Sequence, residues 1–266
     1  AKDRLGAELH TNFRLGETEY LALADPSGTV VSEFAPTYPE QFENVAYGVA
    51  QSGNRSTTSL IAREAAGRVL VPTQDIGTSW RDVDFDDTSW ASATTGIGYE
   101  TGNGYQALFG TNADLESEMF ARSTSVYLRI PFQINEISSV SELVLRMNYD
   151  DGFVAWINGV QVAAENAPAA LTWTSEATEN HEDESALVFQ NFDASEAVPR
   201  LKEGTNLLTI QGLNVGNDSS DMLILPELDA VEVSEVQSGE VGYLERATPG
   251  ALNGASFEGF VSDTKF

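Results

Sequence analysis

The chain has 266 residues, 41 acidic and 14 basic, so its formal net charge at pH 7 is −27. Nucleic acids and anionic lipids bind basic surfaces, so this balance argues against both as partners. The absence of cysteine and the presence of two histidines exclude disulfides, thiolate chemistry and multi-histidine zinc or copper sites. No apolar run is long enough to predict insertion into a membrane.

Short alternating apolar runs, separated by Gly, Asn, Asp and Ser, predict strands throughout the chain. Long stretches with helical spacing are absent. The pattern predicts an all-β protein: a jelly-roll β-sandwich with a small accessory β region formed by the chain ends. The predicted strands are residues 20–24, 126–132, 143–147, 153–157, 160–163, 207–211 and 222–225.

Composition divides the chain into four segments. Residues 1–50 hold short strands and a proline-rich loop, and the polar residues 51–68 predict a linker. Residues 69–236 form the strand-rich block that we expect to be the jelly roll. Residues 237–266 form a return segment and tail that contains glycine and proline.

A β-hairpin is predicted around Asn158-Gly159, which stands between two alternating runs. Both central residues of a type I′ turn need a positive φ, which Asn and Gly tolerate best. Asp150, Asp151 and Gly152 precede the first of these strands. The two carboxylates therefore stand at a strand entry, where a hard cation or a sugar hydroxyl could be held.

Five stretches together resemble a galactose-binding-like, carbohydrate-binding-module-like jelly roll of secreted planctomycete-type multidomain proteins. The segment Phe85–Trp90 also resembles sugar-binding jelly rolls at the front of many glycoside hydrolases. The resemblance implies a β-sandwich in an extracellular or cell-surface protein. The stretches are residues 80–90, 95–100, 127–132, 150–159 and 214–228.

The flanks resemble the second half of a lamin-tail domain, through residues 10–15, 19–28, 32–36 and 247–253. The front strands of that module are missing, and the jelly roll looks inserted before its closing segment. The resemblance implies a partial lamin-tail segment at residues 1–50 and a lamin-tail-like end at residues 237–266. Alternatively, the flanks pair with each other as a small accessory sheet.

Calcium is the candidate cofactor, because its ligands are hard oxygens in flexible geometry. Asp150 and Asp151 resemble the paired-aspartate loop of PA14-type sugar-binding domains, in which calcium bridges protein and sugar hydroxyls. That resemblance makes residues 214–218 the second loop, and implies Asp150, Asp151, Asn214 and Asn217 as metal ligands. The alternative is a plain turn in which one aspartate caps backbone amides.

Aromatic side chains can pack against the apolar face of a sugar, while carboxylates and amides direct its hydroxyls. Tyr99, Glu100 and Tyr105 offer both kinds of group in one predicted mobile loop, and Trp173 lies in a polar segment. The predicted ligand-binding residues are Tyr99, Glu100, Tyr105, Trp173, Asn214 and Asp221. We expect Trp80, Trp90 and Trp156 in the core, and the acidic run 82–87 as one solvated face.

Catalysis is not expected. The sequence contains neither a Gly-x-Ser-x-Gly elbow nor a phosphate- or dinucleotide-binding glycine motif. The chain begins with Ala1 and shows no signal peptide, so we expect a monomeric fragment of a larger chain.

We therefore expect non-catalytic, calcium-assisted binding of a polysaccharide or glycan, in a secreted or cell-surface multidomain protein. Two alternatives stay open. One is a structural or adhesive spacer that calcium stabilises without any glycan ligand. The other is an accessory domain of a polysaccharide-degrading enzyme.

Overall fold

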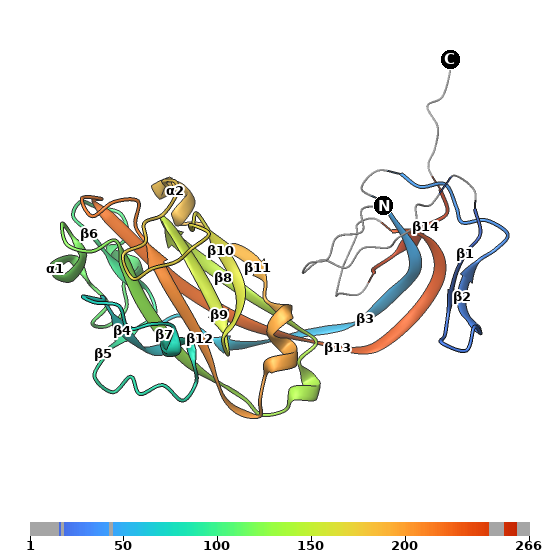
Figure 1. Cartoon of the computed structure of the whole chain (residues 1–266), viewed down its shortest axis with the longest axis horizontal. Coiled ribbons are helices and arrows are strands. Elements are labelled where there is room, and N and C mark those ends of the chain that lie inside the picture. The colour runs from blue at the N-terminus through green and yellow to red at the C-terminus, as the bar shows by residue number, and fades with distance from the viewer. Residues whose placement is uncertain (1–15, 17–18, 43–44, 245–252, 260–266) are drawn as a thin grey trace, which may run out of the picture. The chain divides into compact units, whose positions relative to one another are not determined.

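The computed structural model describes residues 16, 19–42, 45–244 and 253–259. It is all-β, as predicted: two antiparallel sheets form a sandwich, two further strands form a two-stranded sheet, and the helices are short (Figure 1). The chain divides into two compact units, Asn54–Glu235 and the pair of segments Ala1–Gly53 and Val236–Phe266. No helix in the described part of the chain is long and apolar enough to cross a membrane.

The first sheet of the sandwich has six strands in the order β10-β9-β12-β7-β4-β5. Its longest ladder joins β12 to β7 over ten residue pairs, from Gly204↔Ile134 to Leu213↔Ser125. The strands are β4 (Ala66–Leu70), β5 (Ala91–Thr94), β7 (Ser125–Ile134), β9 (Gly152–Ile157), β10 (Val160–Glu165) and β12 (Gly204–Leu213).

The second sheet is built on β13, which pairs with β8, β6, β3 and β14, while β11 pairs with β8. The strands are β3 (Ala46–Ile61), β6 (Ile97–Glu100), β8 (Glu142–Asp150), β11 (Gln190–Asp193), β13 (Asp221–Leu244) and β14 (Ser256–Phe257). The short helices are η1 (Ser79–Arg81), η2 (Gln106–Leu108), α1 (Glu116–Met119), η3 (Ile137–Ser139), α2 (Asp183–Ala186) and η4 (Ser195–Arg200).

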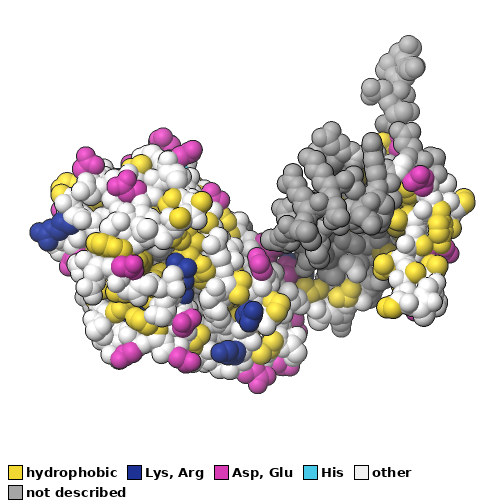
Figure 2. All heavy atoms as spheres, in the orientation of Figure 1, with side chains coloured by type: hydrophobic (Ala, Val, Ile, Leu, Met, Phe, Trp, Pro, Cys, Tyr) yellow, Lys and Arg dark blue, Asp and Glu magenta, His cyan; other side chains and the backbone are white. Residues whose placement is uncertain are grey.

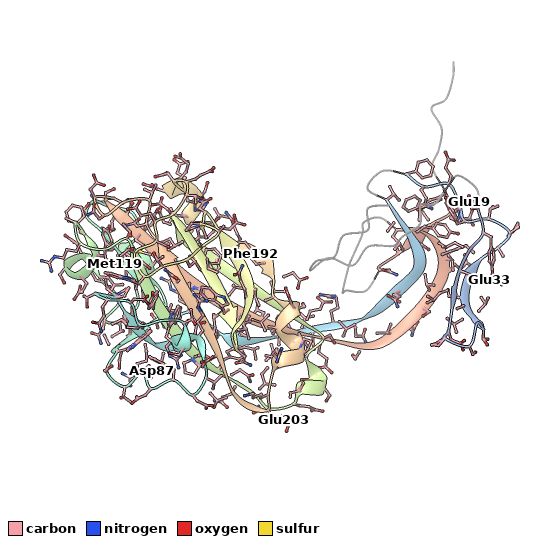
Figure 3. All side chains as sticks on the ribbon, in the orientation of Figure 1. Glu19, Glu33, Asp87, Met119, Phe192 and Glu203 are labelled. Carbon is pink, nitrogen blue, oxygen red and sulfur yellow. The ribbon has the colours of Figure 1, made fainter. Side chains whose placement is uncertain are left out.

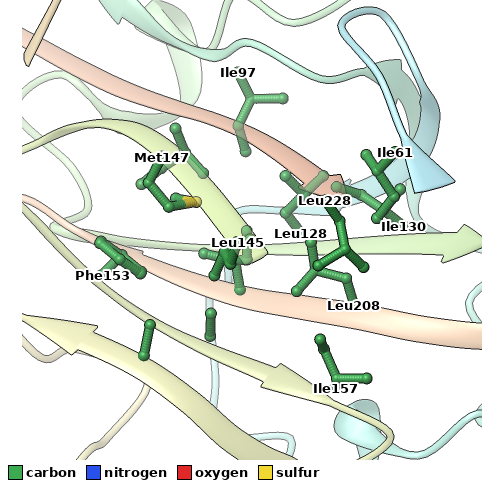
Figure 4. Close-up of a cluster of buried hydrophobic side chains, with 14 of the residues drawn as sticks. Ile61, Ile97, Leu128, Ile130, Leu145, Met147, Phe153, Ile157, Leu208 and Leu228 are labelled. Carbon is green, nitrogen blue, oxygen red and sulfur yellow. The ribbon is translucent and has the colours of Figure 1, made fainter. Parts of the chain in front are cut away.

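The hydrophobic core lies between the two sheets, because alternate residues of each strand point inward. Leu128 of β7, Leu145 of β8 and Leu208 of β12 are at most 1% exposed, and Figure 4 shows them with their neighbours. Burying one such side chain stabilises the fold by about 1.5–3 kcal/mol relative to leaving it exposed. The core therefore holds the strands in place, including the end of β8 at which Asp150 lies.

A second apolar cluster covers the opposite face of the first sheet. Tyr127 and Trp156 alternate with core residues along β7 and β9, and they pack with Trp80, Trp90 and Val154. Trp80 stacks on Tyr127 with ring centroids 4.3 Å apart. The prediction that the three tryptophans are buried is confirmed, and this group is called the outer aromatic cluster below.

The predicted hairpin is confirmed. Asn158 and Gly159 join β9 to β10 with φ values of 47° and 81°, and Ile157 is paired with Val160. The Asn158 side chain also contacts the chain elsewhere: its Nδ2 donates to the carbonyl of Arg200 (3.0 Å), and its Oδ1 accepts from the amide of Leu207 (3.0 Å).

Residues 82–87 alternate as expected, with Asp82, Asp84 and Asp86 exposed and Phe85 half-buried against Trp90. Asp87 departs from that pattern, because its Oδ2 pairs with Arg129 Nε at 2.7 Å. Figure 3 labels Asp87, and Figure 2 shows acidic side chains spread over the visible face.

The smaller unit contains the two-stranded sheet of β1 (Leu21–Ala24) and β2 (Val30–Phe34). Rings of Phe34, Tyr47, Tyr243 and Phe257 form a chain of aromatic contacts within it. Glu19 and Glu33, labelled in Figure 3, belong to this unit. Residues 10–15 and 247–252, which carry part of the lamin-tail resemblance, lie outside the described residues.

The segment 51–68, predicted as a linker, is mostly strand. Its first eleven residues belong to β3, and its last three begin β4. Polar residues occur there because the side chains of Asn54–Ser59 are exposed to solvent. The polar composition therefore reflects exposure and does not indicate a lack of secondary structure. The boundary between the two units lies at Gly53 and at Glu235, within β3 and β13.

Candidate functional site

Asp150 and Asp151 lie where the core strand β8 ends and β9 begins, and they are joined by a cis peptide bond. Both residues are only 1% exposed. The register places Asp150 opposite Leu223 of β13, so the pair lies beside the first residues of that strand. Buried carboxylates need hydrogen-bond partners or a cation, and the two aspartates meet this need differently.

Asp151 is held by backbone amides. Its Oδ1 accepts from the amide of His181 (3.0 Å), and its Oδ2 accepts from the amide of Val215 (2.7 Å). Its backbone carbonyl accepts from Asn166 Nδ2 (2.9 Å). Both carboxylate oxygens are therefore occupied in joining two loops to the sheet, which fits the capping alternative for this residue.

Asp150 instead faces other acidic groups. Its Oδ2 accepts a hydrogen bond from the hydroxyl of Tyr105. Ligand oxygens of Asp150, Asp183 and Asp221 all lie within 4.8 Å of one another. Two oxygens on opposite sides of one Ca²⁺ are about 5 Å apart, since Ca–O distances are about 2.3–2.6 Å. The three groups, called the carboxylate cluster below, fit a single ion of this kind.

The electrostatics of the cluster are those of an uncompensated negative site. Burial raises the pKa of Asp150 to about 8; the Tyr105 hydrogen bond opposes this shift, and the negative charges of Asp151 and Asp221 add to it. Burial also raises the pKa of Asp221 to about 6, with further contributions from Asp183 and Glu100. A bound cation would favour the ionised form of each group.

No basic side chain compensates the cluster among the residues that the structure describes. The ion pairs there join Arg55 to Glu142, Arg129 to Asp87 and Arg146 to Glu227. Asp183 is exposed, whereas Asp150 and Asp221 are buried. A cation would therefore have protein oxygens on its inner side and an approach from solvent beside Asp183.

Tyr99 and Tyr105 are both 0% exposed, so the expectation that they present their rings to a sugar from a mobile loop is wrong. Tyr99 lies in β6; its hydroxyl donates to the carbonyl of Ser219 (2.9 Å) and accepts from Asn214 Nδ2 (2.8 Å). Burial raises the pKa of Tyr99 to about 12. The hydroxyls of Tyr99 and Tyr105 thus both have polar hydrogen-bond partners inside the protein, and such partners allow a tyrosine to be buried.

Asn214 is also fully buried, and its Oδ1 has no hydrogen-bond partner. A buried amide oxygen left in this state costs about 1–3 kcal/mol. Glu100 lies opposite Asp221 in the β6–β13 ladder, and its Oε1 accepts from the amide of Gly102 (2.8 Å). Both residues thus belong to the structure around the cluster.

Trp173 and Asn217 lie elsewhere, along a groove of about 650 Å³. Trp173 is half-buried and packs against the outer aromatic cluster, while Asn217 is exposed. The structure does not bring Asn217 into the carboxylate cluster with Asp150. The groove is lined by Val71, Pro72, Thr73, Glu118, Arg122, Ser123, Thr124, Trp173, Thr174, Glu176 and Asn217.

One loop connects the two sites. It begins at Asn214 and Val215, which are bonded to Tyr99 and Asp151, and it ends at Asp221 in the cluster. Between them, the carbonyl of Asn217 accepts from the amide of Ala121 beside the groove (2.6 Å). The position of Asn217 is therefore set by a loop whose ends are anchored at the carboxylate cluster.

Sequence reasoning missed Asp183 as a member of the cluster. The acidic run Glu182-Asp183-Glu184 was visible, but no sequence pattern relates it to Asp150. It also missed His181, whose ring stacks on Tyr149 at 4.3 Å and whose amide holds Asp151.

No protein-family model matches the chain, and no curated protein matches it. Among solved structures, it is similar to a calcium-binding mutant of Bacteroides uniformis β-glucuronidase 2, with 15% identity over 67% of this chain and 18% of that one, and a TM-score of 0.40. It is also similar to a glycosyl hydrolase family 2 member from Bacteroides cellulosilyticus, with 12% identity over 66% of this chain and 20% of that one, and a TM-score of 0.38.

The β-glucuronidase of Ruminococcus gnavus gives 13% identity over 74% of this chain and 31% of that one, with a TM-score of 0.39. The chain therefore spans less than a third of the length of each of these three enzymes. The similarity is to one part of each, and the family of this chain is not assigned by it.

Proposed function

We propose that this protein is a non-catalytic carbohydrate-binding module that works with a divalent cation. A glycan lies in the groove beside Trp173, and the cation, calcium by its ligand chemistry, lies at Asp150, Asp183 and Asp221. The observation that carries the proposal is the shared loop, which supplies Asp221 to the cluster and Asn217 to the groove.

The lining of the groove suits a sugar. The half-buried indole of Trp173 offers an apolar surface for the C–H face of a pyranose ring. Glu118, Glu176 and Asn217 bring carboxylate and amide groups to the same groove, where they can accept or donate hydrogen bonds to hydroxyls. This combination of an aromatic wall and a few polar groups is typical of small-ligand sites.

The cation acts at a distance from the sugar in this proposal. Asp150 and Asp221 are 1% and 8% exposed, so an ion held by them is largely enclosed. Its effect is to neutralise the cluster and to fix the end of the loop that carries Asn217. This differs from the sequence-based expectation, in which calcium bridges protein and sugar directly.

A cation-stabilised spacer without a glycan ligand is the second candidate, and the same burial favours it. An enclosed ion stabilises a fold whether or not a ligand binds nearby. Both candidates fit an extracellular or cell-surface setting, which we retain as part of the proposal.

The test is a glycan-array screen of the whole chain, run once with calcium and once with a chelator. We expect binding that weakens at least tenfold in the chelator. Trp173→Ala should abolish binding, and Asp183→Asn should reproduce the chelator effect, because Asp183 is the exposed member of the cluster. Glu184→Gln removes a neighbouring charge outside the cluster and should bind normally.

Three results would contradict parts of the proposal. Glycan binding that is unchanged by the chelator and by Asp183→Asn would separate the cation from recognition. Binding unchanged by Trp173→Ala would place the sugar outside this groove. Absence of glycan binding, together with a calcium-dependent rise in melting temperature, would establish the spacer.

A further inference from the structure

Arg81 has an unusual environment for a charged side chain. It ends η1, and its guanidinium carbon lies 3.7 Å from the centre of the Trp156 ring and 5.4 Å from that of Trp80. It is half-buried, and burial lowers its pKa. Its Nε is buried without a hydrogen-bond partner, and the guanidinium forms no ion pair or hydrogen bond with any residue that the structure describes.

Two other arginines of the sandwich are partnered. Arg129, on the same sheet face, pairs with Asp87 and donates to the backbone carbonyls of residues 80, 82 and 85. Arg146 pairs with Glu227 at 2.7 Å. In a chain with 41 acidic residues, the lack of a carboxylate at Arg81 leaves its charge available. Burial raises the pKa of Tyr127 to about 12; the charge of Arg81 opposes this shift, and Asp75, whose Oδ1 accepts from the amide of Gly77, adds to it.

A second polar atom on this face is also unpartnered. The Oγ1 of Thr209 is buried without a hydrogen bond, and Thr209 lies directly opposite Trp156 in the β9–β12 ladder. Two unsatisfied groups, one a donor and one able to donate or accept, therefore lie next to the same indole ring. Such groups are uncommon in folded proteins.

We propose that Arg81, stacked on Trp156, binds the oxyanion of an acidic glycan, either the carboxylate of a uronic acid or a sulfate ester. This proposal rests on the glycan-binding function proposed above and specifies the class of glycan. A guanidinium is planar and offers two parallel N–H donors, which match two oxygens of a carboxylate or sulfate. Trp156 holds that plane by stacking, so little freedom is lost on binding.

The position of Arg81 connects it with the groove. Trp173, which lines the groove, packs against the cluster that contains Trp156. Trp173 and Arg81 therefore both contact the outer aromatic cluster, Arg81 through Trp80 and Trp156. The net charge of −27 repels anions from most of the surface, so an anion binds at Arg81 only where the stacked guanidinium also fits its geometry.

The first experiment needs no glycan and uses the whole chain. Sodium sulfate and sodium glucuronate are titrated at constant ionic strength against sodium chloride, and Trp fluorescence and melting temperature are recorded. We expect a saturable signal with both anions in the wild type and its loss in Arg81→Gln. Lys202→Gln, which removes an exposed positive charge before β12, should behave as the wild type.

The second experiment compares a sulfated or uronic oligosaccharide with its neutral parent. We expect Arg81→Gln to weaken binding of the acidic form about tenfold or more, the scale of a lost charge-assisted hydrogen bond, and to change binding of the neutral form less than twofold. Arg81→Lys keeps the charge without the planar pair of donors, and should also weaken the acidic form.

The outcomes are separable. Equal anion titrations in the wild type and Arg81→Gln, or normal acidic-glycan binding by Arg81→Lys, would overturn the Arg81 assignment while leaving glycan binding intact. An anion signal that depends on Arg81, in a protein that binds no glycan, would support the oxyanion site and reject the proposed function. Melting curves of each variant, recorded without ligand, identify any variant that fails to fold.

Discussion

Asp150 and Asp151 are adjacent and equally buried, yet their surroundings give them different roles. Asp151 has backbone N–H donors on both carboxylate oxygens. Asp150 has one hydroxyl donor and faces two further acidic groups. The difference follows from which loops reach each side chain, and it makes Asp150 the residue whose ionisation responds to a cation.

Without a cation, Asp150 should make stability depend on pH. The pKa of Asp150 in the folded state, about 8, is above the ordinary value of 3.8 for this carboxyl group. Between these two pH values the folded state therefore binds one proton more than the unfolded state. Unfolding free energy should therefore fall as pH rises from about 4 to 8, by up to about 1.4 kcal/mol per pH unit from this group. Asp221, with a pKa of about 6, adds to the loss below pH 6.

Urea unfolding at several pH values, in chelator and followed by Trp fluorescence, measures this slope. All four tryptophans lie in the unit Asn54–Glu235, so the signal reports that unit. Asp150→Asn should flatten the slope, and Asp218→Asn, an exposed acid of the neighbouring loop, should leave it unchanged. A slope that is equal in Asp150→Asn and the wild type would show that Asp150 is ionised throughout the range.

The residue types of the site could be predicted from the sequence, but their grouping could not. A paired aspartate before a strand is a local pattern, and it identified Asp150. Asp183 reaches the cluster only because α2 packs beside β8, where Asn148 Nδ2 donates to the carbonyl of Ala186 (2.6 Å). Tyr99 and Tyr105 were misjudged because hydroxyl partners that allow burial come from distant segments.

At the scale of elements, β6 positions Asp221 of the carboxylate cluster through its pairing with β13. It pairs with the first residues of β13, so that Glu100 lies opposite Asp221 and Gly98 opposite Leu223. Gly98 has a φ of +153°, and a Cβ there would lie 1.9 Å from the carbonyl oxygen of Met222. Only glycine lets the two strands approach this closely at that position.

Gly98→Ala should therefore destabilise the protein by about 3 kcal/mol, because the methyl group meets backbone that cannot move aside alone. It should also weaken calcium binding, since Asp221 lies in the displaced strand. Gly102→Ala is the matched control, because its Cβ would meet only the Glu100 side chain. Equal urea midpoints for the two variants would mean that β6 and β13 tolerate separation.

The same scale separates what sequence patterns can and cannot predict. The turn at Asn158-Gly159 was predictable because its constraint is local: two adjacent residues with positive φ. β3 was not, because half of its side chains are exposed and no apolar alternation marks the strand. β3 pairs with β13, which is far from it in the sequence, and such a long-range pairing cannot be predicted from local composition.

For the whole molecule, the dominant property is a net charge of −27. Self-repulsion of this size opposes the folded state, and salt screens it. Raising NaCl from 0.05 to 0.5 M in chelator should therefore raise the melting temperature by at least the 2–4 °C that corresponds to about 1 kcal/mol. Sucrose at equal osmolality controls for non-ionic effects; a fall with salt would mean that the ion pairs outweigh the repulsion.

Asn158-Gly159 has a chemical consequence besides its place in the hairpin. Asn-Gly is the dipeptide most prone to deamidation, since the glycine amide readily attacks the asparagine side chain. In the folded protein that side chain is bonded to Arg200, Asn206 and Leu207 at 2.8–3.0 Å, which keeps it from the attacking geometry. Isoaspartate at position 158 would thus accumulate only in molecules that have opened, and so record how often this hairpin unfolds over the lifetime of the protein.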